Sequence, residues 1–249
     1  ATPEFYTLSL HDALPISAKA LGQPKELTLD LGNDVSMKLV LIPPGTFTMG
    51  SPADEKGRDK DEGPQREVTI SEPFHMGVYE VTQEQYQAVM GKNPSYFRGA
   101  KNPVEAISWN DITDFCRKLS QKTGKRVALP TEAQWEYACR AGTKTPFSTG
   151  QTISTDQANY NGNSFFSSGH KGAYREKTIA VGSFSPNAFG LYDMHGNVHE
   201  WCSDWSGSYA NANGVDPEGP RTGTHHVVRG GSWADGNYTC RSAARFMYR

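Results

Sequence analysis

The feature that most restricts the fold of this sequence is a long stretch, residues 143–225, in which no hydrophobic periodicity lasts. Gly, Asn, Ser and aromatic residues dominate this stretch, and only short strand candidates occur in it. A connection of that length inside a compact domain is usually functional. The chain of 249 residues also carries 25 Gly, 15 Pro, 11 Phe, 11 Tyr and 5 Trp, which argues against a helical bundle and against disorder. We therefore expect an irregular domain with many turns and an aromatic interior.

Strands are predicted mainly before this stretch. Alternating apolar residues over 26–31 and 36–41, separated by Gly32-Asn33-Asp34, predict a β-hairpin. Dense mixed charge with Gly and Pro over 52–66 predicts a solvated loop. Further strands are expected over 67–70 and 76–80, and the last strand candidate is 226–229.

Three helices have clear start signals. Each begins with a Ser or Thr whose hydroxyl can accept a hydrogen bond from a free backbone N–H, followed three residues later by a side chain that can return the bond. With neither repeat nor linker, the elements predict one α+β domain. The expected caps are Thr82, Ser108 and Thr131, and the expected stops are Gly91, Gly124 and Gly142.

Charge and composition exclude several classes of partner. The net charge is −2, with acidic and basic residues interspersed, so neither nucleic acid nor an anionic membrane surface is indicated. No apolar run approaches the roughly 20 residues that span a bilayer. Four cysteines are too few for a disulfide scaffold. The compartment therefore stays open between the bacterial periplasm or exterior and the cytoplasm.

The first residues are set apart from the fold. Residues 1–20 lack the basic start, the long apolar stretch and the cleavage site of a signal peptide. The segment TLSLHDALPIS (residues 7–17) resembles a translated sequencing adapter of the kind found in assembled metagenomic genes. We therefore treat residues 1–20 as a non-native or unstructured leader and assign the domain to residues 21–249. The native N-terminus, with any export signal on it, is expected to be missing.

Seven segments form a characteristic set in order and spacing. They are LIPPGTFTMGS (41–51), DEGPQREVTI (61–70), YEVTQEQY (79–86), NPVEAISWNDITDFC (102–116), LPTEAQWEYACRAGT (129–143), NAFGLYDMHGNVHEW (187–201) and RGGSW (229–233). Together they resemble the sulfatase-modifying-factor family, whose founding members are formylglycine-generating enzymes. The resemblance covers about residues 36–249 and implies a heavily elaborated, C-type-lectin-like α+β fold. It also implies that the chain stops before the family's closing strand, which would leave a neighbouring strand edge unpaired.

The resemblance implies a calcium site in residues 193–200. Asp193 and Glu200 would supply carboxylates, and Gly196 and Val198 would supply backbone carbonyls. Several oxygen ligands, loop carbonyls included, suit a hard cation such as Ca²⁺. The alternative is a plain turn that leads into a strand, with Glu200 in an exposed ion pair.

The resemblance implies a second calcium site around Asn159 and the carbonyl of Tyr160. The carbonyl of Tyr174 would contribute, but Lys171 or Gly172 stands where the family has an aspartate. This departure leaves the second site without one of its charges.

His195 and His199, beside Glu200, have a superficial likeness to a zinc pair. Two histidines four residues apart share a face only on a helix. Gly196 and Asn197 lie between them, which favours a loop.

The resemblance also implies an active site in which two thiolates bind copper(I), a soft ion that favours sulfur ligands. Counting from Ser232 places the two ligand positions at Asp235 and Cys240, so the candidates Ser232 and Cys240 would belong to an incomplete site. Counting back from residues 243–245 places Cys240 at neither position. Alternatively, Cys240 is a buried apolar residue, or it forms a disulfide with Cys139.

Two functions follow. One is a copper-dependent oxidase that converts Cys to formylglycine in a Cys-x-Pro-x-Arg motif of sulfatases. The other is a monomeric, calcium-stabilised recognition module, a pseudoenzyme that binds a protein or peptide ligand. Its binding surface would use polar and aromatic side chains in irregular backbone, which suit adaptable binding. In the alternative, the aromatic members of this surface simply pack in the interior. The candidates are Asp235, Asn237, Tyr238, Thr239, Phe246 and Tyr248.

Overall fold

The alternating residues near the start of the chain form the expected hairpin. The computed structural model describes residues 22–164, 171–209 and 214–249. Strand β1 (Glu26–Gly32) pairs antiparallel with β2 (Val35–Ile42), which pairs on its other side with β5 (Phe74–Gly77). The turn places Asn33 and Asp34 at φ 54° and 60°, a left-handed conformation that these two residue types tolerate well. Strand β5 lies earlier in the chain than the 76–80 expected from the sequence.

The three helices begin where their caps predict. Each cap hydroxyl accepts from the backbone N–H three residues on, and the side chain at that position accepts in return from the backbone of the cap. The first two end at the expected glycines, whereas the third ends at Ala141 (φ 45°), one residue before Gly142. The helices are α2 (Gln83–Met90), α3 (Trp109–Thr123) and α4 (Glu132–Arg140).

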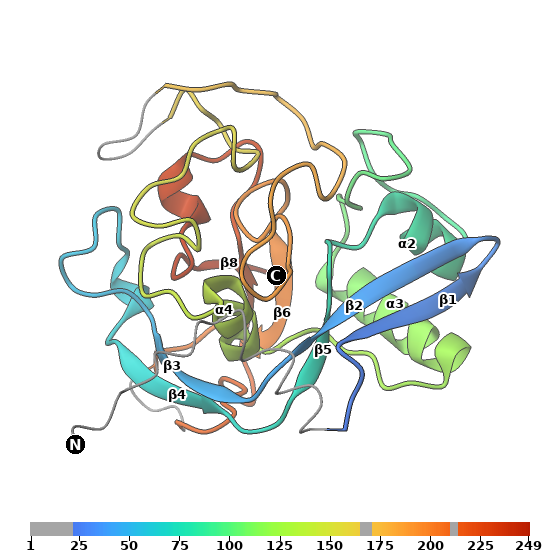
Figure 1. Cartoon of the computed structure of the whole chain (residues 1–249), viewed down its shortest axis with the longest axis horizontal. Coiled ribbons are helices and arrows are strands. Elements are labelled where there is room, and N and C mark those ends of the chain that lie inside the picture. The colour runs from blue at the N-terminus through green and yellow to red at the C-terminus, as the bar shows by residue number, and fades with distance from the viewer. Residues whose placement is uncertain (1–21, 165–170, 210–213) are drawn as a thin grey trace, which may run out of the picture.

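Two lobes lie side by side in Figure 1. The helical lobe, on the right, consists of the β1-β2-β5 sheet with α2 and α3 packed against β1 and β2. Its core is apolar because the inward faces of the hairpin and of α3 both carry aliphatic and aromatic side chains. The buried members are Leu29, Leu31, Met37, Tyr86, Val104, Ile112, Phe115, Cys116 and Leu119.

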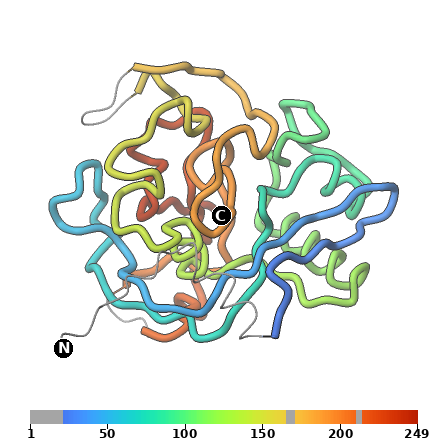
Figure 2. The backbone as a smooth tube through the Cα atoms, viewed as in Figure 1, coloured from blue at the N-terminus to red at the C-terminus, as the bar shows by residue number. Residues whose placement is uncertain are grey.

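The loop-rich lobe, on the left of Figure 1, is built from two small sheets around α4. Strands β3 (Gly45–Met49) and β4 (Arg66–Ile70) form one sheet, and a second has the order β6-β7-β8. Figure 2 shows the irregular tube of residues 143–164 and 171–199, yellow to orange, running over this lobe and reaching the helical lobe. The remaining elements are β6 (Glu200–Trp205), β7 (His226–Arg229), β8 (Phe246–Tyr248) and the 3₁₀ turns η1 (Lys60–Glu62) and η3 (Asn237–Cys240).

The predicted fold class, an irregular α+β domain with little regular structure, is confirmed, but one strand after residues 226–229 was not predicted. Residues 226–229 are not the last strand, because β8 pairs antiparallel with β7. Strand β7 therefore has a hydrogen-bonded neighbour on each side. No helix in the described ranges is long and apolar enough to cross a membrane.

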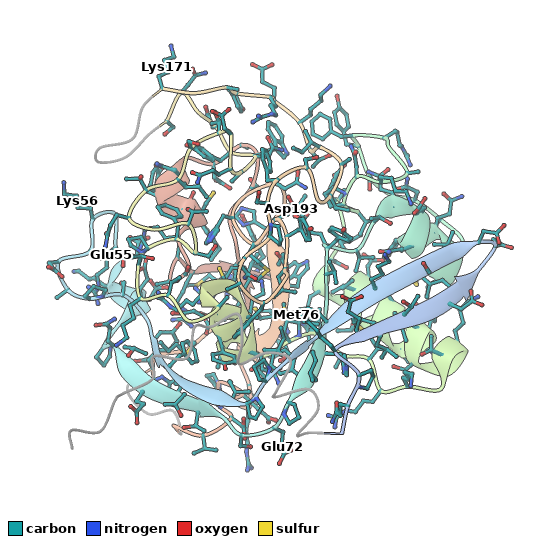
Figure 3. The ribbon with its side chains drawn as sticks, viewed as in Figure 1. Glu55, Lys56, Glu72, Met76, Lys171 and Asp193 are labelled. Atoms are coloured by element: carbon teal, nitrogen blue, oxygen red, sulfur yellow. The ribbon has the colours of Figure 1, made fainter. Side chains whose placement is uncertain are left out.

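The charged segment 52–66 is not wholly solvated, as its composition predicted. Glu62 is buried, and its two oxygens accept hydrogen bonds of 2.6 and 2.8 Å from the guanidinium of Arg241. Glu55, labelled on the blue loop in Figure 3, pairs with the same guanidinium at 2.5 Å. The loop is therefore fixed to η3 at the other end of the chain, because a buried charge must be paired.

A network of ion pairs lies inside the loop-rich lobe. Glu132 and Glu136 on α4 face Arg229 at the end of β7 and Arg245 just before β8. Burial alone would raise the pKa of Glu132, but the charges of Arg245 and Arg229 hold it below its usual value. The network ties α4 to the β6-β7-β8 sheet by charge as well as by apolar contact.

Candidate functional site

Residues 193–200 form a loop at the junction of the two lobes, where Figure 3 labels Asp193. Asp193, Gly196 and Asn197 have φ of 57°, 93° and 62°, so the segment cannot be helical. Tyr192 N donates to the carbonyl of Val78, which links the start of the loop to the helical lobe (3.0 Å). The irregular backbone turns several carbonyl groups out of regular hydrogen bonding, as an oxygen-lined cation site requires.

The two carboxylates expected at this loop are held by neutral donors. Asp193 Oδ2 accepts from the backbone N–H of Gly182 at 2.6 Å, and Glu200 Oε2 accepts from Trp135 Nε1 at 3.1 Å. Burial raises the pKa of Asp193 to about 6. Burial, with the nearby charge of Asp193, raises the pKa of Glu200 to about 7. These two groups concentrate negative charge that a cation would neutralise.

A third carboxylate, Glu80, lies at the same loop and was not predicted from the sequence. It lies between β5 and α2 and accepts from Asn197 Nδ2 at 2.7 Å and from the backbone N–H of Val198 at 3.1 Å. Burial raises its pKa well above the usual range, and the charges of Asp193 and Glu200 add to the effect. The available signal was a charged residue between Tyr79 and Val81, two residues before the helix cap Thr82.

Asn159, from the second expected site, lies directly against this loop. Its backbone forms a parallel bridge with Gly196, and its Nδ2 donates to Asn197 Oδ1 at 3.1 Å. Its Oδ1 atom is buried with no hydrogen-bond partner among the described residues. A buried amide oxygen without a donor is uncommon, and it suits a cation ligand.

The rest of the second expected site is not assembled in the same way. Tyr160 is buried, and its hydroxyl donates to the carbonyl of Ile153. Lys171 is exposed and extends outward at the top of Figure 3, away from Asp193. Tyr174 stacks on Trp233 with ring centres 6.1 Å apart. None of these side chains supplies the carboxylate that the family has there.

The histidines of the loop do not form a zinc pair. His195 is buried, its Nδ1 donates to the carbonyl of Cys240 at 2.8 Å, and its Nε2 accepts from the backbone N–H of Ser148 at 3.0 Å. Burial lowers the pKa of His195 to about 4, so the ring is neutral. His199 instead pairs with Asp235 at 3.0 Å. Within the described ranges, no three His, Cys, Asp or Glu side chains are grouped closely enough to hold one ion by themselves.

The two positions expected to bind copper do not form a soft-metal site. The Cys240 side chain is fully buried beneath Gly231, and its thiol donates to the carbonyl of Gly236 at 3.6 Å. Burial, with the charge of Asp235, raises the pKa of this thiol far above its usual value. The group is therefore a neutral thiol next to a hard carboxylate, which does not fit copper(I).

Asp235 has polar partners of its own. Its Oδ2 atom accepts from Ser232 Oγ at 2.6 Å and from His199 Nε2 at 3.0 Å. Although burial acts in the opposite direction, these two hydrogen bonds hold the pKa of Asp235 below its usual value. This Ser–Asp–His cluster was not predicted, because His199 lies far from Ser232 in the sequence.

The possible disulfide between Cys139 and Cys240 is not formed. All four cysteines are free and buried. The sulfur of Cys139 lies 3.6 Å from Ser242 Oγ and 3.9 Å from His195 Nε2. Because Cys139 faces Ser242, Cys240 is left to pack in a separate apolar cluster with Tyr160.

The surface expected after Ser232 is divided between exposed and buried side chains. Tyr238 and Tyr248 are 39% and 47% exposed, whereas Asn237 is buried. The ring of His199 lies edge-on to Phe246 and Tyr248, at 4.7 and 5.9 Å. Phe246 therefore packs against His199, and Tyr248 lies at the surface beside the Asp235–His199 pair.

Comparison with known proteins identifies one family over most of the chain. Residues 32–248 match the family described as "Sulfatase-modifying factor enzyme 1-like domain". The chain is 30% identical to the chaperone protein LppX of Paenibacillus barcinonensis, over 80% of this chain and 79% of that protein. It is also 30% identical to the formylglycine-generating enzyme of Mus musculus, over 85% of this chain and 69% of the enzyme.

Two solved structures share the fold. PvdO from Pseudomonas aeruginosa superposes with a TM-score of 0.76 at 32% identity and covers 91% of this chain and 93% of its own. Treponema denticola variable protein 1 gives the same TM-score at 28% identity and covers 91% of this chain and 94% of its own.

Proposed function

The chain belongs to the sulfatase-modifying factor enzyme 1-like domain family, and from this premise we propose that it is a calcium-stabilised recognition module for a protein or peptide rather than a formylglycine-generating oxidase. The observation that carries the proposal is the pairing of Asp235 with Ser232 and His199 beside the buried thiol of Cys240. An oxidase of this family would need two thiolates there. A charged, hydrogen-bonded carboxylate is a recognition group instead.

Calcium is proposed for the loop of residues 193–200. Asp193 and Glu200 would supply charged oxygens, and Gly196 and Val198 would supply carbonyl oxygens. The bound ion would contribute positive charge where burial raises the pKa of both Asp193 and Glu200 and where the charge of Asp193 adds to the effect on Glu200. The unsatisfied Oδ1 atom of Asn159 supports a neighbouring cation ligand as well.

Recognition is proposed for the surface around the Asp235–His199 pair. Tyr248 contributes a half-exposed aromatic ring, a large contact area that costs little conformational entropy on binding. Asp235 contributes an accepting group beside it. Together they present adjacent apolar and polar groups, a combination that suits a peptide.

A direct test of recognition uses a displayed library of random peptides. We expect peptides selected on the wild-type protein to lose most of their binding to Asp235→Ala and Tyr248→Ala. The matched control is Tyr96→Ala, because Tyr96 is a more exposed tyrosine with no contact to the Asp235–His199 pair in the described structure. Equal binding by all variants, or no enriched peptide at all, would refute the proposed surface.

The oxidase remains the second candidate, because a formylglycine-generating enzyme is among the relatives. Its test is incubation of the copper(I)-loaded protein under air, in the presence of calcium, with a Cys-x-Pro-x-Arg peptide. Mass spectrometry would detect conversion of the cysteine to formylglycine. Conversion that Cys240→Ala abolishes and Cys202→Ala preserves would overturn the recognition proposal. No conversion by a protein whose melting temperature still rises with calcium supports it, because a ligand of the native state stabilises that state.

A further inference from the structure

We propose that Glu80 is a positioning residue that couples cation binding at the 193–200 loop to the helical lobe. The inference rests on the calcium site proposed above and assigns a role to a residue outside its ligand set. Glu80 lies between β5 and the cap of α2, so its backbone belongs to the helical lobe. Its side chain is 8% exposed and is directed at the loop of the other lobe.

Glu80 uses both carboxylate oxygens on this loop. Oε2 accepts from the side-chain amide of Asn197 at 2.7 Å, and Oε1 accepts from the backbone N–H of Val198 at 3.1 Å. A buried polar group that loses its hydrogen-bond partner is costly, so these two bonds hold Glu80 and the loop together. Because both oxygens accept hydrogen bonds from the loop, we assign Glu80 the role of holding the loop's conformation. We do not include it among the proposed calcium ligands.

Asn197 is the residue through which Glu80 reaches three other segments. Its Oδ1 accepts from Asn159 Nδ2 and from the backbone N–H of Ile179, both at 3.1 Å. Its backbone N–H donates to the carbonyl of Asn159, and its carbonyl accepts from Trp233 N at 3.0 Å. If the Glu80–Asn197 hydrogen bond changes, the bonds from Asn197 to the segments around residues 159, 179 and 233 should therefore change with it.

The same bonds fix the orientation of the carbonyl groups proposed as ligands. In a planar trans peptide the N–H and the C=O point in opposite directions. The N–H of Asn197 points at Asn159, so the carbonyl of Gly196 points away from it. The N–H of Val198 points at Glu80, which fixes the Asn197–Val198 peptide plane, the plane between the two peptides that carry the proposed carbonyl ligands. Glu80 thus holds the loop in the shape that presents both carbonyls.

The sequence of β5, Glu80 and α2 gives this coupling a mechanical path. Thr82, two residues after Glu80, caps α2, and Val81 packs in the core of the helical lobe and accepts from Val104 N through its carbonyl. Movement of the 193–200 loop therefore reaches the start of α2 through one side chain and one short segment of backbone. Other bonds cross the junction too, including Val181 N to the carbonyl of Lys101, beside the Gly182 N–H that donates to Asp193. Glu80 differs from them in that its own side chain, next to the cap of α2, bonds directly to the loop.

The test titrates calcium chloride into the wild-type protein, Glu80→Gln and the matched control Glu84→Gln. Glu84 is another glutamate of the same segment, but it pairs with Lys101 at the surface. We expect the calcium affinity of Glu80→Gln, followed by melting temperature, to fall about 10-fold, since partners that orient metal ligands have effects of that order. Glu84→Gln should match the wild type.

A second readout uses the wild-type protein alone and does not depend on how the variant folds. Amide hydrogen exchange should slow on calcium addition both in residues 193–200 and around residues 78–83. A wild-type protein that responds to calcium only in the loop, or a Glu80→Gln variant with unchanged affinity, would overturn the role of Glu80 and leave the calcium site standing. A wild-type protein with no calcium response in either readout would overturn both.

Discussion

The two lobes are stabilised by different interactions, although they belong to one chain of ordinary composition. The buried members of the helical-lobe core are aliphatic and aromatic residues with one cysteine. The loop-rich lobe also buries an apolar core, but around it lie Glu132, Glu136 and Arg229 with their side chains almost entirely removed from water. The first lobe follows from local hydrophobic patterning, whereas the second depends on charge pairs that form only in the finished fold.

The first prediction removes one partner of the buried network. Arg229→Met should lower the free energy of unfolding by about 4 kcal/mol, because it leaves Glu132 and Glu136 buried with fewer counter-charges. Arg229 also donates to the carbonyl of Ala244 and lies over the ring of Trp135 at 5.2 Å. Urea unfolding measures the loss. The control Arg117→Met, in an exposed pair on α3, should cost less than about 1 kcal/mol.

Adding Glu136→Gln to Arg229→Met sharpens the comparison. Glu136 also pairs with the buried Arg140 at 2.8 Å, so the double variant does not return to the wild-type stability. It should nevertheless lose less than the sum of the two single changes, because the Arg229–Glu136 pair is then removed as a whole. A double variant as unstable as the sum of the two single changes would show that these charges do not act as a pair.

The second prediction removes apolar volume from the helical lobe. Leu119→Ala should cost about 3 kcal/mol, since Leu119 is fully buried on α3 and its loss leaves a cavity. The same urea experiment measures it, with Lys118→Ala on the exposed face of α3 as the control. Should Leu119→Ala cost no more than its control, the helical lobe would not depend on its apolar core as the structure implies.

The third prediction concerns pH. Burial raises the pKa of Asp204 in β6 to about 6, and its Oδ2 atom accepts from the backbone N–H of Glu132 at 2.8 Å. The folded-state pKa is above the unfolded one, so its contribution to stability is complete below about pH 4 and is lost as the pH rises through about 6. Asp204→Asn keeps an acceptor without the charge and should become more stable than the wild type by about 2 kcal/mol over that interval.

Urea unfolding between pH 4 and pH 7 checks this difference. The exposed Asp30→Asn, in β1, provides a matched control that should run parallel to the wild type. Parallel curves for Asp204→Asn as well would contradict the raised pKa.

The fourth prediction has the smallest expected effect. Ser108→Ala removes the cap of α3, where Ser108 Oγ accepts from the backbone N–H of Asp111 at 3.2 Å. It should cost about 1 kcal/mol, the usual value for a lost N-cap. Thr113→Ala, in the second turn of the same helix, is the control and should stay within about 0.5 kcal/mol of the wild type in thermal unfolding. A Ser108→Ala variant as stable as Thr113→Ala would mean that the cap hydrogen bond adds nothing.

The helical lobe was largely predictable because its signals are local. A cap such as Ser108 and a stop such as Gly124 act over one turn, and both are formed as expected. Strand β8 was missed because three residues, Phe246–Tyr248, carry too little alternation to indicate a strand before its partner β7 is in place. The stop at Ala141 was missed because glycine is favoured in the left-handed conformation that Ala141 adopts here.

The candidate site was only partly predictable. The family resemblance marked Asp193 and Glu200, which do lie at one loop, but nothing in the sequence connects Glu80 with Asn197, 117 residues later. Likewise, Asp235 could be placed by counting from Ser232, whereas its bond to His199 depends on how β6 lies beside the last segments of the chain. Contacts of this kind are properties of the packed fold, and local patterns do not contain them.

The contacts between Arg241 and the 52–66 loop have a consequence for how sequences related to this one diverge. The guanidinium of Arg241 makes three contacts with this loop. It pairs with Glu55 and Glu62, and it donates to the carbonyl of Gly57. A lysine cannot reproduce that planar fork. Among descendants of this sequence, insertions between positions 55 and 62 should therefore be rare while the arginine persists, and loss of the arginine should be accompanied by replacement of both glutamates. Two segments at opposite ends of the chain are thus expected to evolve as one unit.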